Sequence, residues 1–371
     1  MPRASSKRQL AVDSSMPKRA RPSRARWRAI SGAAGLLLAI TTPIPDGTAI
    51  RPAQATRQQA ADPALPALMA RAEAGDPSAQ NELAEKLENG EGVEQDLRAA
   101  ARWYRLAAEQ GLAEAALNLG VLYENGEGVE QDLGEAASWY RQAAAGGEVL
   151  AQLTLGLMYR EGRGVPRDYP QAVRWLREVA DRGFAIGQIN LAFMYLDGLG
   201  VERDDVEAAA LLTKAAERGH PVAQNNLAML YAAGRGVPRD PKLAARWHEN
   251  AAAQGLANAQ YRLARLYERG QGVARDEAAA ARWYRQAAAQ GERAAQARLG
   301  LMYLDGRGVA QDDLLAFAWL TLAAQGELEP ALRARVATAR SSLTRRMSGA
   351  ELAAGEAKIE ELRKRRGSPE S

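Results

Sequence analysis

The sequence predicts an all-α fold, a right-handed αα-superhelix (a solenoid) of seven 36-residue helix–loop–helix repeats with capping helices. The first observation behind this prediction is a period of 36 residues. The stretch "GEGVEQDLRAAARWYRLAAEQG" from Gly90 returns as "GEGVEQDLGEAASWYRQAAAGG" from Gly126. The second is the helical spacing of apolar residues on both sides of a glycine-rich break in each period. One helix pair cannot bury its apolar faces alone, so the repeats are expected to stack.

Residues 1–55 are expected to be a signal peptide with a long basic n-region. Residues 1–28 contain nine Lys/Arg and one acidic residue, and an apolar run follows at 29–40. Small residues then end at Ala49 and Ala55, the two candidate cleavage positions, and translation starts at Met1 or Met16. The apolar run is shorter than the roughly 20 residues that span a bilayer.

This N-terminal pattern predicts a periplasmic or secreted bacterial protein with no stable transmembrane segment in its mature form. The alternative is an inner-membrane tether formed by residues 29–44.

The rest of the chain is expected to form four parts. They are a linker and N-terminal capping helix at 56–74, seven repeats at 75–326, C-terminal capping helices at 327–357, and a basic, disordered tail at 358–371. The repeats begin at Gly75, Gly111, Gly147, Gly183, Gly219, Gly255 and Gly291.

Each repeat is expected to contain two helices joined by a tight turn. In the second repeat, Ala115, Leu122 and Tyr123 recur at helical spacing, and Gly126 and Gly128 end that helix because a tight exit requires positive φ. An aspartate is expected to cap the second helix of every repeat: Asp96, Asp132, Asp168, Asp204, Asp240, Asp276 and Asp312. The buried stripe of the second helix is expected to consist of Ala136, Trp139, Ala143 and Ala144, with the tryptophan filling the space between repeats.

The repeated pattern A-x-x-x-L-[GA]-x-x-Y-x-x-G-x-G-V-x-x-D-x-x-x-A-x-x-W-Y-x-x-A-A resembles the Sel1-like repeat family, a relative of tetratricopeptide repeats. It departs where Leu211 and Leu212 replace the Trp-Tyr pair and where His248 replaces the tyrosine. The resemblance implies an adaptor: a periplasmic regulator, an envelope-assembly scaffold or a secreted factor. A cysteine-rich branch of the family is associated with β-lactam binding, but its disulfides cannot form in a chain without cysteine.

The sequence shows no catalytic set, so the protein is expected not to be an enzyme, with no cofactor and no bound metal. It has two histidines, His220 and His248, and neither has a second ligand at the spacing of a metal site. The Gly-x-Gly pairs follow helices and lack a third glycine, which indicates repeat turns rather than nucleotide-binding loops.

The basic charge of the chain is confined to its ends. The net charge is +4, but residues 1–60 carry +9 and residues 327–371 carry +3, which leaves −8 on residues 61–326. A nucleic-acid-binding protein needs its basic residues on the folded surface. We therefore expect protein partners and no nucleic acid.

Partner contacts are expected on the first helices, at positions that vary between repeats. Positions four, seven, eleven and fourteen share one helix face, which lines the concave groove of related tetratricopeptide domains. Asparagines beside it are expected to bond the backbone of a bound peptide. The predicted groove consists of Leu117, Leu150, Leu153, Leu157, Ile186, Ile189, Phe193, Leu196, Met229, Asn118, Asn190 and Asn226. The alternative is that this face is core, buried against the following repeat.

The leading hypothesis is a non-enzymatic, exported adaptor or scaffold that binds a protein through this groove, in envelope assembly or signalling regulation. The alternatives are an envelope hydrolase or β-lactam-binding protein, a secreted factor that contacts host proteins, and a scaffold retained at the inner membrane or in the cytosol.

Overall fold

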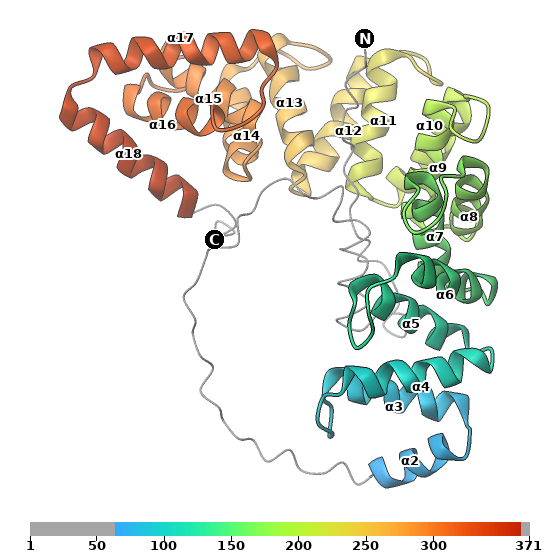
Figure 1. Ribbon diagram of the computed structural model, residues 1–371. Coiled ribbons are helices and arrows are strands. Elements are labelled where there is room, and N and C mark those ends of the chain that lie inside the picture. The colour runs from blue at the N-terminus through green and yellow to red at the C-terminus, as the bar shows by residue number, and fades with distance from the viewer. Residues whose placement is uncertain (1–63, 365–371) are drawn as a thin grey trace. The chain divides into compact units, whose positions relative to one another are not determined.

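The computed structural model describes residues 64–364, and all of their regular structure is α-helical (Figure 1). The predicted signal peptide and the last residues of the predicted tail lie outside the described residues. Within 64–364, no helix combines the length and the apolar character needed to cross a membrane. The chain divides into two compact units, which meet in sequence at Asp204 and Asp205.

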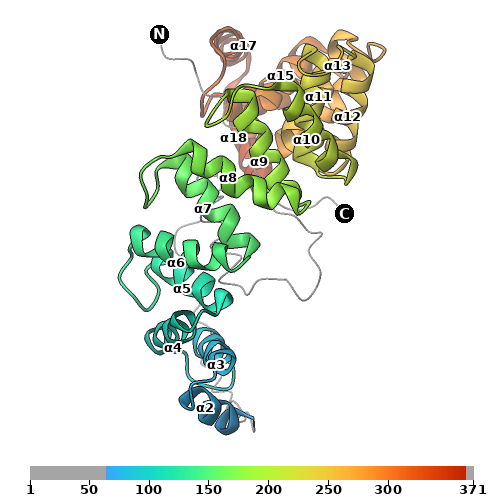
Figure 2. The ribbon, with the colours of Figure 1, turned by 90° about the vertical axis from the view of Figure 1, so that its right-hand side faces the viewer.

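The first unit is a stack of helices in chain order (Figure 2). Each helix packs against the next one along the chain, which is the arrangement of a solenoid. Its helices are α2 (Leu65–Glu73), α3 (Pro77–Asn89), α4 (Leu97–Glu109), α5 (Ala113–Asn125), α6 (Leu133–Ala145), α7 (Val149–Glu161), α8 (Tyr169–Asp181) and α9 (Ala185–Asp197).

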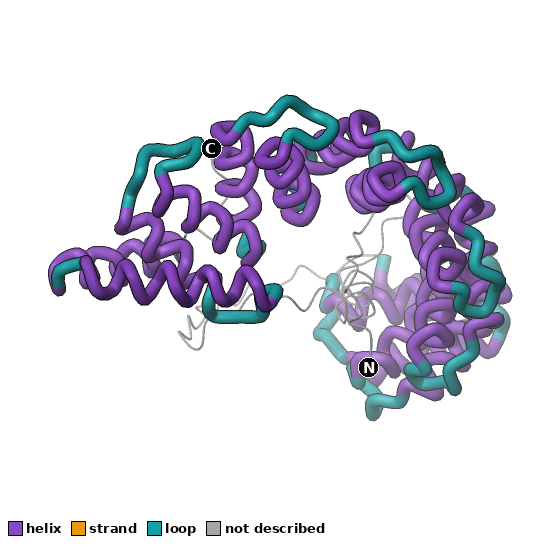
Figure 3. The backbone as a smooth tube through the Cα atoms, turned by 90° about the horizontal axis from the view of Figure 1, so that it is seen from above, coloured by secondary structure: helices purple, strands orange, loops and turns teal. Residues whose placement is uncertain are grey.

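The second unit repeats this packing and ends in two longer helices. Its helices are α10 (Asp205–Glu217), α11 (Pro221–Ala233), α12 (Pro241–Ala253), α13 (Ala257–Arg269), α14 (Glu277–Ala289), α15 (Arg293–Asp305), α16 (Asp313–Ala323), α17 (Pro330–Arg346) and α18 (Gly349–Lys364). Loops join them throughout, and the described part of the chain contains no strand (Figure 3). The prediction of an all-α solenoid of helix–loop–helix repeats is confirmed.

The turn inside each repeat depends on two glycines with different roles. Gly126 ends α5 in the left-handed conformation, with φ of 72°, and its N–H donates to the carbonyl of Leu122. Gly128 also has φ of 72°, and a Cβ there would lie 2.2 Å from the carbonyl oxygen of Leu97 at the start of α4. The second glycine is therefore required because the turn touches the backbone of the preceding repeat.

Aspartate caps begin six of the seven second helices, and at those six the prediction is confirmed. The Asp132 carboxylate accepts hydrogen bonds from the N–H groups of Gly134 and Glu135, at 2.8 and 3.0 Å. The same cap is present at Asp96, Asp168, Asp240, Asp276 and Asp312. The Asp132 N–H also donates to the carbonyl of Tyr123, 3.0 Å away, which closes the loop.

The buried aromatic residue of the second helix differs from the predicted one. Trp139 is half-buried, whereas Tyr140, which follows it, is 1% exposed. The prediction that Trp139 belongs to the buried stripe needs correcting, because Trp139 packs against the core but stays only partly buried. Tyr140 packs on Gly120 of α5, where an added Cβ would lie 2.8 Å from the ring. The glycine removes the side chain that would otherwise keep the ring out.

The C-terminal cap extends beyond its expected end at 357, because α18 continues to Lys364. Ile359 is buried on α18, and Gly355 lies against the ring of Phe317 on α16. These contacts explain why residues expected to lie in a disordered tail are helical.

Candidate functional site

Most of the predicted groove residues are buried in the structure. Three of them are half-buried: Leu150 on α7, Ile186 on α9 and Met229 on α11. The other nine are buried: Leu117, Leu153, Leu157, Ile189, Phe193, Leu196, Asn118, Asn190 and Asn226. Ile189 and Asn190 are 0% exposed and present no surface to a partner, so the expectation that they contact one directly needs correcting.

The first helices of neighbouring repeats bury this face by touching each other. Asn118 on α5 donates to the Asn81 side chain on α3 at 3.2 Å, and Arg160 on α7 donates to the Asn190 side chain on α9 at 2.9 Å. Helical spacing places a residue on a face, but it does not show whether the next repeat covers that face. Leu150 and Ile186, at position four of the third and fourth repeats, retain some surface, whereas Val222 at position four of the fifth repeat is buried.

The predicted row of asparagines is already engaged within the chain. The Asn190 side chain donates to the carbonyl of Ile186 at 2.8 Å, and that of Asn226 donates to the carbonyl of Val222 at 2.7 Å. A peptide backbone would have to displace these bonds.

A buried polar cluster that was not predicted from the sequence lies between helices of the repeats. The tyrosine hydroxyl of the second helix donates to a glutamate 16 residues earlier, on the first helix: Tyr104 to Glu88 at 2.6 Å, Tyr140 to Glu124 at 2.6 Å and Tyr284 to Glu268 at 2.8 Å. An arginine from the next repeat joins two of these pairs, from Arg163 to Glu124 at 2.5 Å and from Arg307 to Glu268 at 3.2 Å. The recurrence of these residues at fixed spacing was the signal for this cluster.

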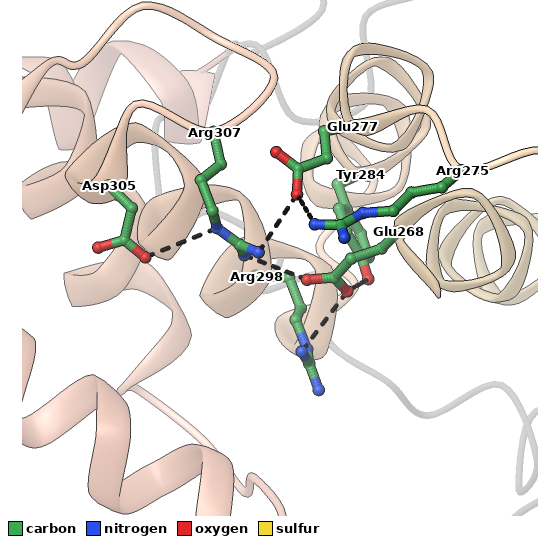
Figure 4. Close-up of polar contacts among 7 residues, drawn as sticks. All are labelled: Glu268, Arg275, Glu277, Tyr284, Arg298, Asp305 and Arg307. Carbon is green, nitrogen blue, oxygen red and sulfur yellow. Dashed lines mark hydrogen bonds and ion pairs between the residues drawn. The ribbon is translucent and has the colours of Figure 1, made fainter. Parts of the chain in front are cut away.

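In the second unit this cluster widens into a network (Figure 4). Glu268 also pairs with Arg298 at 3.5 Å, and Arg307 pairs with Glu277 and Asp305, each at 3.7 Å. Burial raises the pKa of Glu268, but the hydrogen bond from Tyr284 and the charges of Arg298 and Arg307 outweigh burial and lower it. The carboxylate is therefore charged and fully partnered, which indicates a structural role.

The fifth repeat lacks this cluster and has a pocket in its place. His248 stands at the tyrosine position, Ala232 at the glutamate position and Gln271 at the arginine position. All three line a cavity of about 310 Å³ between α11, α12 and α13. Small or polar residues at the positions of the larger cluster residues account for the space.

The walls of this pocket are basic. Arg262, Arg265 and Arg269 of α13 line it, together with the predicted groove residue Met229. The Arg265 Nε is buried and has no hydrogen-bond partner among the described residues. The pKa of Arg262 is lowered by burial and by the positive charge of Arg265.

His248 is 4% exposed, and its Nδ1 has no hydrogen-bond partner in the described part of the chain. Burial and the charge of Arg262 lower its pKa to about 3, so the imidazole is neutral near pH 7. The other histidine, His220, lies at the N-cap of α11 and is buried. Within residues 64–364, no cluster of His, Cys, Asp and Glu has the composition of a metal site.

Comparisons with known proteins identify seven repeats with the same 36-residue period, each match beginning two residues after the glycine used above. A family model described as "Sel1 repeat" matches residues 77–112, 113–148, 149–184, 185–220, 221–256, 257–292 and 293–327. The chain is similar to the crystal structure of a Sel1 repeat protein from Oxalobacter formigenes, with 36% identity, a TM-score of 0.65 and coverage of 73% of this chain and 78% of that one.

A second solved structure is c5321, described as a protective antigen present in uropathogenic Escherichia coli strains and displaying an SLR fold. It is 28% identical, with a TM-score of 0.52 and coverage of 80% of this chain and 78% of that one. No curated protein matches the chain.

Proposed function

The chain belongs to the Sel1 repeat family, and on that premise we propose that it is a non-enzymatic, exported adaptor that binds a protein partner. Sel1 repeat solenoids commonly mediate protein–protein interaction. The partner acts in envelope assembly or in the regulation of signalling, as the signal-like N terminus favours.

The observation that carries this proposal is an apolar edge on the first helices of the first unit. Leu150 on α7 and Ile186 on α9 occupy the same position of successive repeats, and both remain half-buried. Leu153 on α7 and Phe193 on α9 belong to the same predicted groove and are each 8% exposed. Fully burying one such side chain stabilises a complex by ~1.5–3 kcal/mol, and a micromolar complex needs ~8 kcal/mol, so several residues have to act together.

The test is crosslinking capture from the envelope of the producing cell, comparing wild type with the double variant Leu150→Asp and Ile186→Asp. The matched control is Leu106→Asp, because Leu106 is 45% exposed on α4, a second helix. We expect one protein to be captured by wild type and control but lost with the double variant, which stays folded with a lowered unfolding temperature because Leu150 also packs against the core. Capture of the same proteins by all three would contradict the proposed face.

Export is tested separately by reading the mature N-terminal residue by mass spectrometry. Ile50 or Thr56 at the N terminus supports cleavage and export. A chain that retains Met1 or Met16 contradicts it and favours the retained scaffold.

A further inference from the structure

We propose that the pocket of the fifth repeat binds a carboxylate, supplied by a ligand in place of the glutamate that other repeats carry within the chain. The first, second and sixth repeats place a carboxylate between their helices, where a tyrosine hydroxyl donates to it. The fifth repeat has Ala232 at the glutamate position and keeps a ring with polar atoms, His248, at the tyrosine position.

The combination of substitutions sets this pocket apart from other repeats without the glutamate. In the fourth and seventh repeats, leucine occupies both positions, which replaces a polar pair by an apolar pair. Leu320 of the seventh repeat fills its site closely, since a Cβ on Gly300 would lie 2.7 Å from its Cγ. In the fifth repeat the small residue Ala232 and the polar ring of His248 both line the site, and a cavity of about 310 Å³ is left. This volume suits one small ligand or one side chain rather than a large cofactor.

The charge of the pocket selects an anion. Arg262, Arg265 and Arg269 recur every three or four residues, so they share one face of α13, and all three line the cavity. Among the described residues, none of the three has a carboxylate within ion-pair distance; Arg262 donates instead to the Asn258 side chain at 2.8 Å. An anion bound here would relieve the repulsion between Arg262 and Arg265.

Acidic groups near this face do not neutralise it. Glu268, on the same helix, is engaged by Tyr284, Arg298 and Arg307. Glu292 acts on Arg262 only through its longer-range charge, and burial raises the pKa of its own carboxyl.

Two buried polar atoms at this site have no hydrogen-bond partner among the described residues. A bound carboxylate would accept a hydrogen bond from one or both of them. The Arg265 Nε is a donor with no acceptor, although its guanidinium lies over the Tyr261 ring at 5.7 Å. The His248 Nδ1 is also without a partner on a side chain that is 4% exposed. Planar arginine groups bind carboxylates with paired hydrogen bonds, which favours a carboxylate over a spherical anion. Ala232, Arg269 and Gln271 are exposed at the rim and leave the site open to solvent.

The test is isothermal titration calorimetry of the full chain with three probes: glutarate, a blocked tripeptide with a central glutamate, and inorganic phosphate. We expect saturable binding of a carboxylate probe, weakened at least tenfold by Arg265→Gln and unchanged by Arg246→Gln. Arg246 is the matched control because it is exposed on α12 and does not line the pocket. This inference does not rest on the adaptor proposal, because no partner protein enters the experiment.

A second variant supplies the carboxylate from within the chain. The double substitution Ala232→Glu and His248→Tyr recreates the pair of the other repeats, so it should abolish carboxylate binding while thermal unfolding is unchanged or shifted upward. If this variant fails to fold, the loss with Arg265→Gln decides the question alone.

The two carboxylate probes distinguish the source of the ligand. Binding of the tripeptide at least as tightly as glutarate identifies an acidic side chain of a partner, whereas binding of glutarate alone identifies a small dicarboxylate. The proposal is overturned if neither carboxylate binds at millimolar concentration, if phosphate binds more tightly than both, or if Arg265→Gln leaves carboxylate affinity unchanged.

Discussion

Replacing Tyr140 by phenylalanine removes one hydroxyl from a fully buried site and nothing else. That hydroxyl donates to the Glu124 carboxylate at 2.6 Å, and both residues are buried. Burial, followed by the neighbouring charge of Glu124, raises the pKa of Tyr140 well above its usual range, so the hydroxyl is protonated and donates.

The expected loss follows from the type of bond. A hydrogen bond to a charged group contributes about 1.5–3 kcal/mol, and within residues 64–364 the Glu124 carboxylate left behind keeps Arg163 as its ion-pair partner. We therefore expect Tyr140→Phe to lower the free energy of unfolding by about 2 kcal/mol. The assay is urea denaturation followed by circular dichroism, with one linear extrapolation applied to all variants.

The matched control is Tyr123→Phe, because the Tyr123 hydroxyl accepts a hydrogen bond from Arg105 at a half-buried position. Its loss should cost less than about 1 kcal/mol, as is usual for exposed polar pairs. Both bonds involve a charged group, so equal losses in the two variants would refute the reasoning that burial makes the Tyr140 bond the stronger one.

Three further predictions concern the turns, the caps and the buried carboxylate. Gly128→Ala should destabilise the protein by more than about 2 kcal/mol, since its Cβ would lie 2.2 Å from a backbone oxygen. The control Gly147→Ala, where a Cβ would have no atom within 4 Å, should cost about 1 kcal/mol from its positive φ alone. Similar shifts in the thermal unfolding of the two variants would contradict the close approach at Gly128. Asp132→Ala should cost about 1 kcal/mol and Asp132→Asn much less, both measured by thermal unfolding; equal costs would remove the capping explanation. Because the pKa of Glu268 is lowered in the folded protein, its contribution to stability is present above the unfolded pKa and is lost as pH falls through the folded pKa. The variant Glu268→Gln should therefore flatten the loss of stability on acidification, measured from neutral pH downward, and an unchanged pH profile would show that Glu268 does not titrate differently on folding.

The repeat architecture could be predicted because the repeats share the same glycines at their turns and the same capping aspartates. The exit at Gly126 and the cap at Asp132 depend on hydrogen bonds within about four residues, and the structure places them as predicted. The positive φ of Gly128 is also as predicted, but its close approach to Leu97 is a contact with the preceding repeat. The burial of the tyrosine at 140 instead of the tryptophan before it was not predictable in this way. Two adjacent aromatic residues lie about 100° apart on a helix, and packing on Gly120 decides which one turns inward.

For the candidate sites too, the sequence gives the helix face of a residue, and packing between repeats decides whether that residue is exposed. Variable positions on the first helices pointed to Leu150 and Ile186, which keep surface, but also to Ile189 and Asn190, which have none. Whether a position is covered depends on side chains from another repeat, such as Arg160 reaching Asn190 across 30 residues of sequence.

The sequence by itself determined the repeat length and the places of the helix pairs, the turns and the caps, because these follow from helical spacing, glycines and capping residues that are visible along the chain. Only the tertiary structure decided that the fifth repeat holds a basic pocket. The three residues responsible, Ala232, His248 and Gln271, are far apart in the chain, and each substitution alone is unremarkable. The packing of α11, α12 and α13 brings them together, and the cavity exists because no neighbouring side chain fills the space they leave.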